Sequence, residues 1–121
     1  MSILAWAGVA LLGGVGAIAR FLLDGFVGSH AASSFPLGTF AVNISGAFLL
    51  GIVTGLALTG DPLVLAGTAT LGSYTTFSTW MLETQRLSEE GEVGRALANT
   101  LISLLVGFGA IAIGRTLGAQ A

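Results

Sequence analysis

Residues 72–80 read Gly-Ser-Tyr-Thr-Thr-Phe-Ser-Thr-Trp and lie within a stretch that is otherwise apolar enough to cross a membrane. They carry five serine and threonine hydroxyls: Ser73, Thr75, Thr76, Ser78 and Thr79. A bilayer core holds no water for a polar side chain or an interrupted backbone, so such a cluster persists there only where it faces protein, water or an ion. The stretch therefore predicts a binding or conduction site at membrane depth, built from neutral polar groups.

The rest of the chain has the composition of a membrane protein. Of its 121 residues 54% are hydrophobic and 8% are charged, and the mean hydropathy is +0.92; soluble domains carry roughly 25% charged residues. Four apolar stretches are each long enough to cross a core of about 30 Å as a helix; they cover residues 3–23, 37–59, 63–82 and 96–114. The sequence predicts an all-α fold, with residues 1–121 forming a single four-helix transmembrane domain.

The sequence lacks the residues that several kinds of catalysis and metal binding require. Cysteine is absent, and no Asp, Glu, His or Lys lies in the middle of a predicted span. This pattern provides no proton relay, carboxylate pair, zinc-ligand set or Ser/His/Asp set. No basic residue precedes the first apolar run, and the first one, Arg20, lies near its end, so we expect no signal peptide. We expect neither an enzyme nor a nucleic-acid partner.

The arginines give only a weak preference for one orientation in the membrane. Arg86 and Arg95 favour a cytoplasmic position for the connection at 83–95, whereas Arg115 favours the opposite orientation. A chain with so little bias can insert both ways and assemble as an antiparallel pair. Four helices hardly enclose a pore by themselves, so we expect an oligomer.

Two glycine pairs have the spacing of a close helix contact. Gly51 and Gly55 lie in the second span, and Gly114 and Gly118 lie at the end of the fourth. Small residues at this spacing let helix backbones approach closely. They predict either tight packing within one subunit or a specific dimer face.

The second span carries a polar face. Thr39, Asn43 and Gly46 are spaced i, i+4 and i+7, which places them on one side of a helix. Asn43 either forms a helix–helix hydrogen bond, worth about 0.6–2 kcal/mol in membranes, or donates its amide hydrogens to an anion in a pore. Beside the hydroxyl-rich third span we favour the second interpretation.

The third span is predicted to break near residues 72–76, because its middle is poor in helix-forming residues. Discontinuous helices form ion sites from freed carbonyls and amides. Phe77 and Trp80, spaced i, i+3, share one face after the break. They either pack in the core or present their positively polarised ring edges to an anion.

Two further polar features have more than one interpretation. Arg20 lies near the end of the first span, where it either reaches the interface, pairs with Asp24, or draws anions to a vestibule. Asn99 and Ser103 share one face of the fourth span with Gly107. Ser103 therefore either bonds to its own helix or extends a polar track.

Three motifs together resemble the Fluc/CrcB fluoride channels, over essentially the whole chain. They are Gly13-Gly14-x-Gly16-Ala17-x-x-Arg20, Pro36-x-Gly38-Thr39-x-x-Val42-Asn43-x-x-Gly46-x-Phe48, and Gly72-Ser73-Tyr74-Thr75-Thr76-Phe77-Ser78-Thr79. The resemblance implies passive fluoride export through a cell membrane by an antiparallel, dual-topology dimer. It also implies two pathways and a structural sodium ion at the centre.

Roles follow by position from the resemblance. Gly72 and Thr75 would offer backbone carbonyls to the sodium ion. The ion pathway would be lined by side chains of the second, third and fourth spans, with Arg20 near its mouth: Asn43, Phe77, Ser78, Thr79, Trp80 and Ser103.

Two residues depart from the family pattern. Trp80 replaces the second phenylalanine, keeping an aromatic edge but adding bulk and an N–H donor, and Ser73 replaces a common glycine. A non-identical partner subunit is therefore an alternative to a homodimer. A small multidrug-type exporter is a further alternative, but it requires a membrane-embedded carboxylate that the first span lacks.

Overall fold

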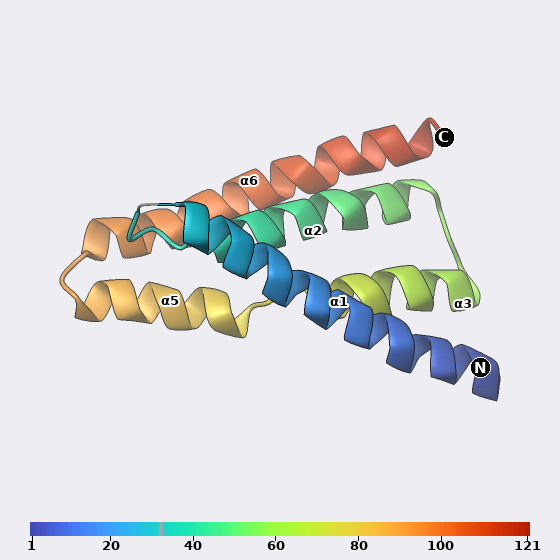
Figure 1. The fold of residues 1–121 in the computed structure, drawn as a ribbon. Coiled ribbons are helices and arrows are strands. Elements are labelled where there is room, and N and C mark those ends of the chain that lie inside the picture. Colours follow the sequence, from blue (N-terminus) through green and yellow to red (C-terminus); the bar gives the residue numbers. More distant parts are fainter. Residues whose placement is uncertain (32) are drawn as a thin grey trace.

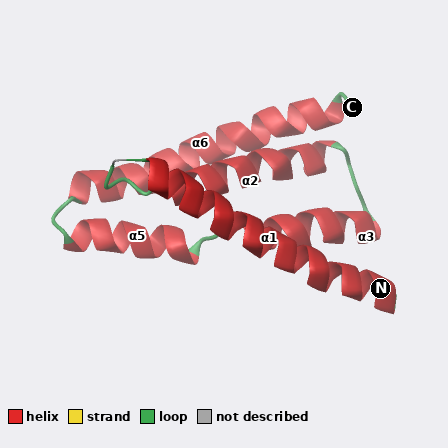
Figure 2. Ribbon diagram, viewed as in Figure 1, coloured by secondary structure: helices red, strands yellow, loops and turns green. Residues whose placement is uncertain are grey.

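The computed structural model describes residues 1–31 and 33–121, and every regular element in this part of the chain is a helix (Figure 2). The predicted all-α class is confirmed. The elements, in order, are α1 (Ile3–His30), α2 (Leu37–Gly55), α3 (Gly60–Leu63), the π-helix η1 (Val64–Leu71), α4 (Gly72–Tyr74), α5 (Ser78–Glu89) and α6 (Val93–Ala119).

The helices run back and forth along the long axis of the molecule, and both termini lie at the same end (Figure 1). α1 crosses obliquely over the other helices, α2 returns, α3 to α5 form the third pass, and α6 returns beside α2 (Figure 1). Among the described residues, α1, α2 and α6 are each long and apolar enough to span a membrane. The third pass is divided into shorter helices, in contrast to the uninterrupted spans.

Helix ends differ from the predicted connections. α1 continues to His30, and α5 to Glu89, so the connections expected at 24–36 and 83–95 are shorter. The connection expected at 60–62 is helical and belongs to α3. Hydropathy indicates where a chain leaves an apolar environment, whereas a helix stops where its backbone can no longer continue. Gly91, with φ +80°, provides such a stop after α5.

α2 and α6 lie in parallel and approach closely through the two glycine pairs. A Cβ on Gly51 would overlap the carbonyl oxygen of Ile111, and one on Gly114 would overlap that of Phe48. Gly55 and Gly118 meet the opposite backbone in the same way. The GxxxG pairs therefore serve packing within one chain, the first of the two predicted uses.

The third pass changes its packing partner halfway. In its first part, η1 and α4 pack on α1, where a Cβ on Gly16 would overlap the Thr70 carbonyl oxygen and Ser73 Oγ. Its second part, α5, packs on the beginning of α6, and Leu87 and Ala96 are buried there. The interruption at 75–77 lies where the chain passes from one partner to the other.

The outer surface of the chain is strongly apolar. Large side chains of α1 such as Leu4 (83% exposed) and Phe21 (74%) point outward. An exposed surface of this kind is energetically acceptable when lipid or a second chain covers it. It agrees with the predicted membrane environment.

Candidate functional site

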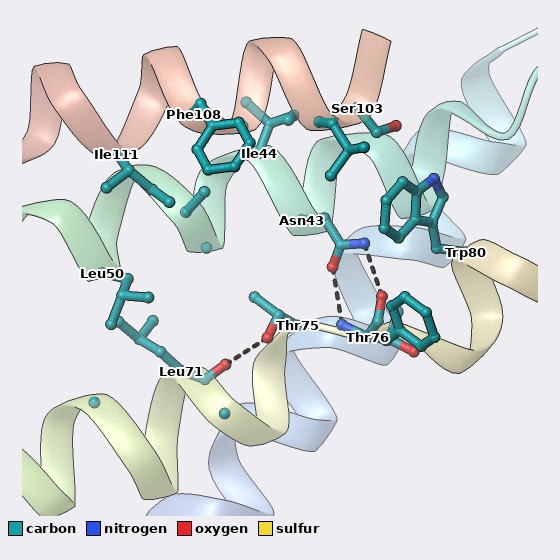
Figure 3. Close-up of a pocket in the computed structure, with 17 residues that line it drawn as sticks. Asn43, Ile44, Leu50, Leu71, Thr75, Thr76, Trp80, Ser103, Phe108 and Ile111 are labelled. Atoms are coloured by element: carbon teal, nitrogen blue, oxygen red, sulfur yellow. Dashed lines mark hydrogen bonds between the residues drawn. The ribbon is translucent and has the colours of Figure 1, made fainter. Parts of the chain in front are cut away.

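The predicted break of the third pass is present, but it lies at residues 75–77 rather than 72–76, because Gly72–Tyr74 remain helical as α4. The α4 helix ends at Tyr74, Thr75 is extended with φ −82° and ψ 162°, and α5 begins at Ser78. Both the amide and the hydroxyl of Thr75 donate to the carbonyl of Leu71, the last residue of η1, each at 3.0 Å (Figure 3). This carbonyl therefore accepts two hydrogen bonds. The π-helix η1 directly before the break adds a second irregularity, a feature common at functional sites.

The side chain of Asn43, which lies on α2, is hydrogen-bonded to the interrupted backbone. Its Nδ2 donates to the Thr76 carbonyl oxygen at 2.8 Å, and the Thr76 amide donates to its Oδ1 at 2.8 Å (Figure 3). One side chain thus satisfies both backbone groups of a residue that has left the helix. Asn43 therefore forms an interhelical hydrogen bond, and it also lines the adjoining cavity.

The break leaves carbonyl oxygens without amide partners. Among residues 1–31 and 33–121, no hydrogen bond is donated to the carbonyls of Gly72 and Thr75. The Ser73 carbonyl accepts from Arg20 Nε at 3.4 Å. Arg20 of α1 therefore contacts α4 just before the break, and within the described residues it forms no ion pair with Asp24.

A cavity of about 380 Å³ adjoins the break and is lined by α2, η1, the residues of the break, α5 and α6. Figure 3 shows most of its labelled polar side chains near Asn43, and most of its labelled aliphatic side chains, Ile44 excepted, toward the other end. The first group includes Asn43, Thr76, Trp80 and Ser103, and the second includes Leu50, Leu71 and Ile111. This arrangement combines hydrogen-bond donors with an apolar wall.

Phe77 and Trp80 form an edge-to-face pair beside this cavity. Their ring centroids are 5.7 Å apart and the ring planes are inclined by 84°. Phe77 is 70% exposed, and Trp80 Nε1 donates to the Asn99 carbonyl oxygen at 3.0 Å. The i, i+3 spacing therefore does place both rings on one face, in contact with each other.

The predicted pathway residues do not all meet in one place. Asn43, Phe77, Trp80 and Ser103 line the cavity, together with Gly72 and Thr75. Three do not line it: Ser78 is exposed, Thr79 is half-buried with its amide bonded to Thr76 Oγ1 at 3.2 Å, and Arg20 lies against Ser73. Their assignment to an ion pathway stays a prediction.

Thr84 belongs to this region and was missed by the sequence reasoning. Its Oγ1 accepts a hydrogen bond from Asn99 Nδ2 at 2.8 Å. Asn99 itself is 1% exposed and lies between α5 and α6. The available signal was the spacing, because Thr84 follows Trp80 by four residues and so lies on the same helical face.

Comparison with known proteins places the chain in a family. The model described as CrcB-like protein, Camphor Resistance (CrcB), matches residues 7–115. A relative named "Fluoride-specific ion channel FluC 2" from Mycolicibacterium paratuberculosis is 57% identical over 112 residues, 93% of this chain and 92% of the relative.

Two further relatives carry the same name. The one from Mycobacterium bovis is 50% identical and covers 95% of this chain and 91% of its own length. The one from Moorella thermoacetica is 44% identical and covers 86% of this chain and 88% of its own length. With a family model spanning most of its length and relatives well above 30% identity, this multi-pass membrane chain belongs to the Fluc/CrcB family.

Proposed function

We propose that this chain is a fluoride-selective ion channel that lets fluoride leave the cell passively and so protects against fluoride toxicity. The observation that carries the proposal is the interruption at 75–77, which Asn43 holds open toward a cavity beside two aromatic rings. Relatives at up to 57% identity among those compared are named fluoride-specific ion channels. The protein is an ion channel of the cell membrane, not an enzyme.

The chemistry of the site suits a small, strongly hydrated anion. Conduction requires binding that is strong enough for entry and weak enough for exit. Neutral donors such as the Asn43 amide and the Ser103 hydroxyl replace water without a fixed positive charge that would retain the ion. Aromatic edges add positively polarised C–H groups. A multidrug-type exporter would instead require an acidic residue within the membrane, and α1 carries its only acidic residue, Asp24, near its end.

The channel is proposed to be an antiparallel, dual-topology dimer. One chain leaves the Phe77 ring 70% exposed and the cavity open beside it, so a second chain is needed to close a pathway. A second copy is the partner we favour. Relatives named FluC 1 and FluC 2 both match this chain, which keeps a paralogous subunit as the alternative partner.

A structural sodium ion is proposed at the break. The carbonyls of Gly72 and Thr75 fit this role, since the helix interruption leaves both without amide partners and unwound carbonyls coordinate sodium in discontinuous membrane helices. The ion would join two copies across their shared axis.

Sodium should therefore stabilise the dimer specifically. We expect the thermal midpoint of the purified dimer to be higher in sodium chloride than in potassium chloride at equal ionic strength. Size-exclusion chromatography after dilution should show more monomer in potassium. Equal stability and equal dimer fractions in the two salts would contradict the sodium site.

Fluoride efflux from liposomes that contain only the purified chain tests the proposed function. A fluoride electrode should record rapid efflux, while a chloride electrode under the same gradient records none above protein-free vesicles. Absence of fluoride efflux from a well-folded dimer would contradict a homodimeric channel and favour the paralogous-partner or non-conducting alternative.

The aromatic edge of Trp80 should be required for that efflux. Trp80→Phe keeps an aromatic edge, and we expect a modest change in rate. Trp80→Ile keeps an apolar side chain without the edge, and we expect efflux to be abolished, because aliphatic C–H groups carry no comparable positive polarisation. Normal efflux through the isoleucine variant would remove Trp80 from the pathway.

A further inference from the structure

Three hydrogen bonds join Trp80, Thr84 and Asn99 in a closed ring, which we call the Trp80 circuit. The indole Nε1–H donates to the Asn99 carbonyl oxygen at 3.0 Å, and Asn99 Nδ2 donates to Thr84 Oγ1 at 2.8 Å. The Thr84 hydroxyl in turn donates to the Trp80 carbonyl oxygen at 2.9 Å. The circuit thus begins on the side chain of Trp80 and ends on its backbone.

The circuit lies where α5 meets α6 and is partly buried. Asn99 is 1% exposed, and its Oδ1 lies 3.5 Å from Ser103 Oγ, a long contact. A threonine hydroxyl has one hydrogen, and that of Thr84 is directed to Trp80. The Asn99 amide must therefore present its N–H to Thr84, which gives each bond of the circuit a defined direction.

An indole has one hydrogen-bond donor and no acceptor. The circuit uses that donor within the protein, so the donor is not free for a ligand. The Trp80 ring then offers only C–H edges and faces to its surroundings, and one of these contacts Phe77 at an angle of 84°. In this respect a tryptophan fixed by the circuit acts as a phenylalanine would, with a defined ring orientation.

We infer that the Trp80 N–H is a structural donor rather than an anion ligand, and that Asn99 and Thr84 are positioning residues that fix the ring beside the ion path. The inference rests on the proposed fluoride channel and names the part of Trp80 that the anion meets. A free N–H in the path would give fluoride a further hydrogen-bond donor, whereas a committed N–H leaves the ring only its weaker C–H contacts with the anion.

Indole N–H resonances of the ¹⁵N-labelled full chain in micelles test this directly. Trp6, which is 61% exposed on α1, supplies the internal reference, and Trp80→Phe assigns the two signals. We expect the Trp80 N–H to exchange slowly with solvent and to keep its position as sodium fluoride replaces sodium chloride. A saturable fluoride-dependent shift of that resonance, absent with chloride, would overturn the inference.

Thr84→Val tests the positioning role. It removes the hydroxyl that makes two of the three hydrogen bonds of the circuit. We expect indole exchange to be at least about fivefold faster, the factor that corresponds to one ordinary hydrogen bond, and fluoride efflux to be several-fold slower. Thr84→Ser should restore both. Thr100→Val is the matched control, because Thr100 Oγ1 donates only to the Ala96 carbonyl of its own helix at 3.1 Å; it should resemble the wild type.

The outcomes separate the inference from the function on which it rests. Unchanged exchange and efflux in folded Thr84→Val would overturn the positioning role. If the wild-type chain passes no fluoride but its Trp80 N–H remains protected, the proposed function fails while the structural role of that N–H is supported. The spectroscopic measurement itself requires no conduction.

Discussion

Asn43→Ala is expected to reduce fluoride efflux by at least about tenfold, the equivalent of roughly 1.4 kcal/mol. The substitution removes both hydrogen bonds to the Thr76 backbone, at 2.8 Å each, together with an amide that lines the cavity. Leaving a partly buried backbone group without a partner costs about 1–3 kcal/mol. The interrupted segment should therefore lose its defined conformation at the point where the proposed pathway needs it.

A matched variant in the same helix separates this effect from a general loss of folding. Thr54→Val removes a hydroxyl that donates to the Leu50 carbonyl of its own helix at 2.8 Å and is exposed, so its efflux should equal that of the wild type. Both variants should be reconstituted at equal dimer content. Wild-type efflux through Asn43→Ala would show that this amide neither lines the pathway nor shapes it.

Gly114→Val is expected to have the largest effect on stability, lowering the free energy of unfolding by about 3 kcal/mol or more. Any Cβ at this position would overlap the carbonyl oxygen of Phe48. Backbone atoms cannot rotate away as a side chain can, so α2 and α6 would have to separate along the contact that joins them. The expected result is little or no monodisperse protein on size-exclusion chromatography.

Gly109→Val is the corresponding control on the same helix. A Cβ on Gly109 meets nothing within 4 Å, so we expect a folded protein with a thermal midpoint near that of the wild type. If the two valine variants unfold at the same temperature, the glycine contact between α2 and α6 is not what holds these helices together.

The features that the sequence predicted correctly are those set by local chemistry. Residues 72–80 are too rich in hydroxyls and poor in helix formers for a regular span, and the structure interrupts the helix at 75–77. The spacing of Phe77 and Trp80 correctly predicted that their rings share a face. In both cases the information lies within a few consecutive residues.

The features that were missed depend on contacts between distant segments. The sequence offered two interpretations of Asn43, and only the position of α2 beside the break shows that its amide spans both polar groups of Thr76. Thr84 follows Trp80 by four residues, but this spacing does not reveal its partner Asn99, which lies on another helix. Asp24 lies one helical turn from Arg20 and was a possible ion-pair partner, yet Arg20 donates to the Ser73 carbonyl instead. Such choices are set by helix register, which hydropathy does not encode.

A reversal potential tests most directly whether copies of this chain, without a different partner subunit, form a fluoride-selective pathway. The purified chain would be inserted in a planar bilayer with sodium fluoride on one side and sodium chloride at equal concentration on the other. We expect a large reversal potential with the sign that fluoride permeation gives. This sign should invert when the two solutions are exchanged. A reversal potential near zero, or one that follows chloride or sodium, would contradict the account.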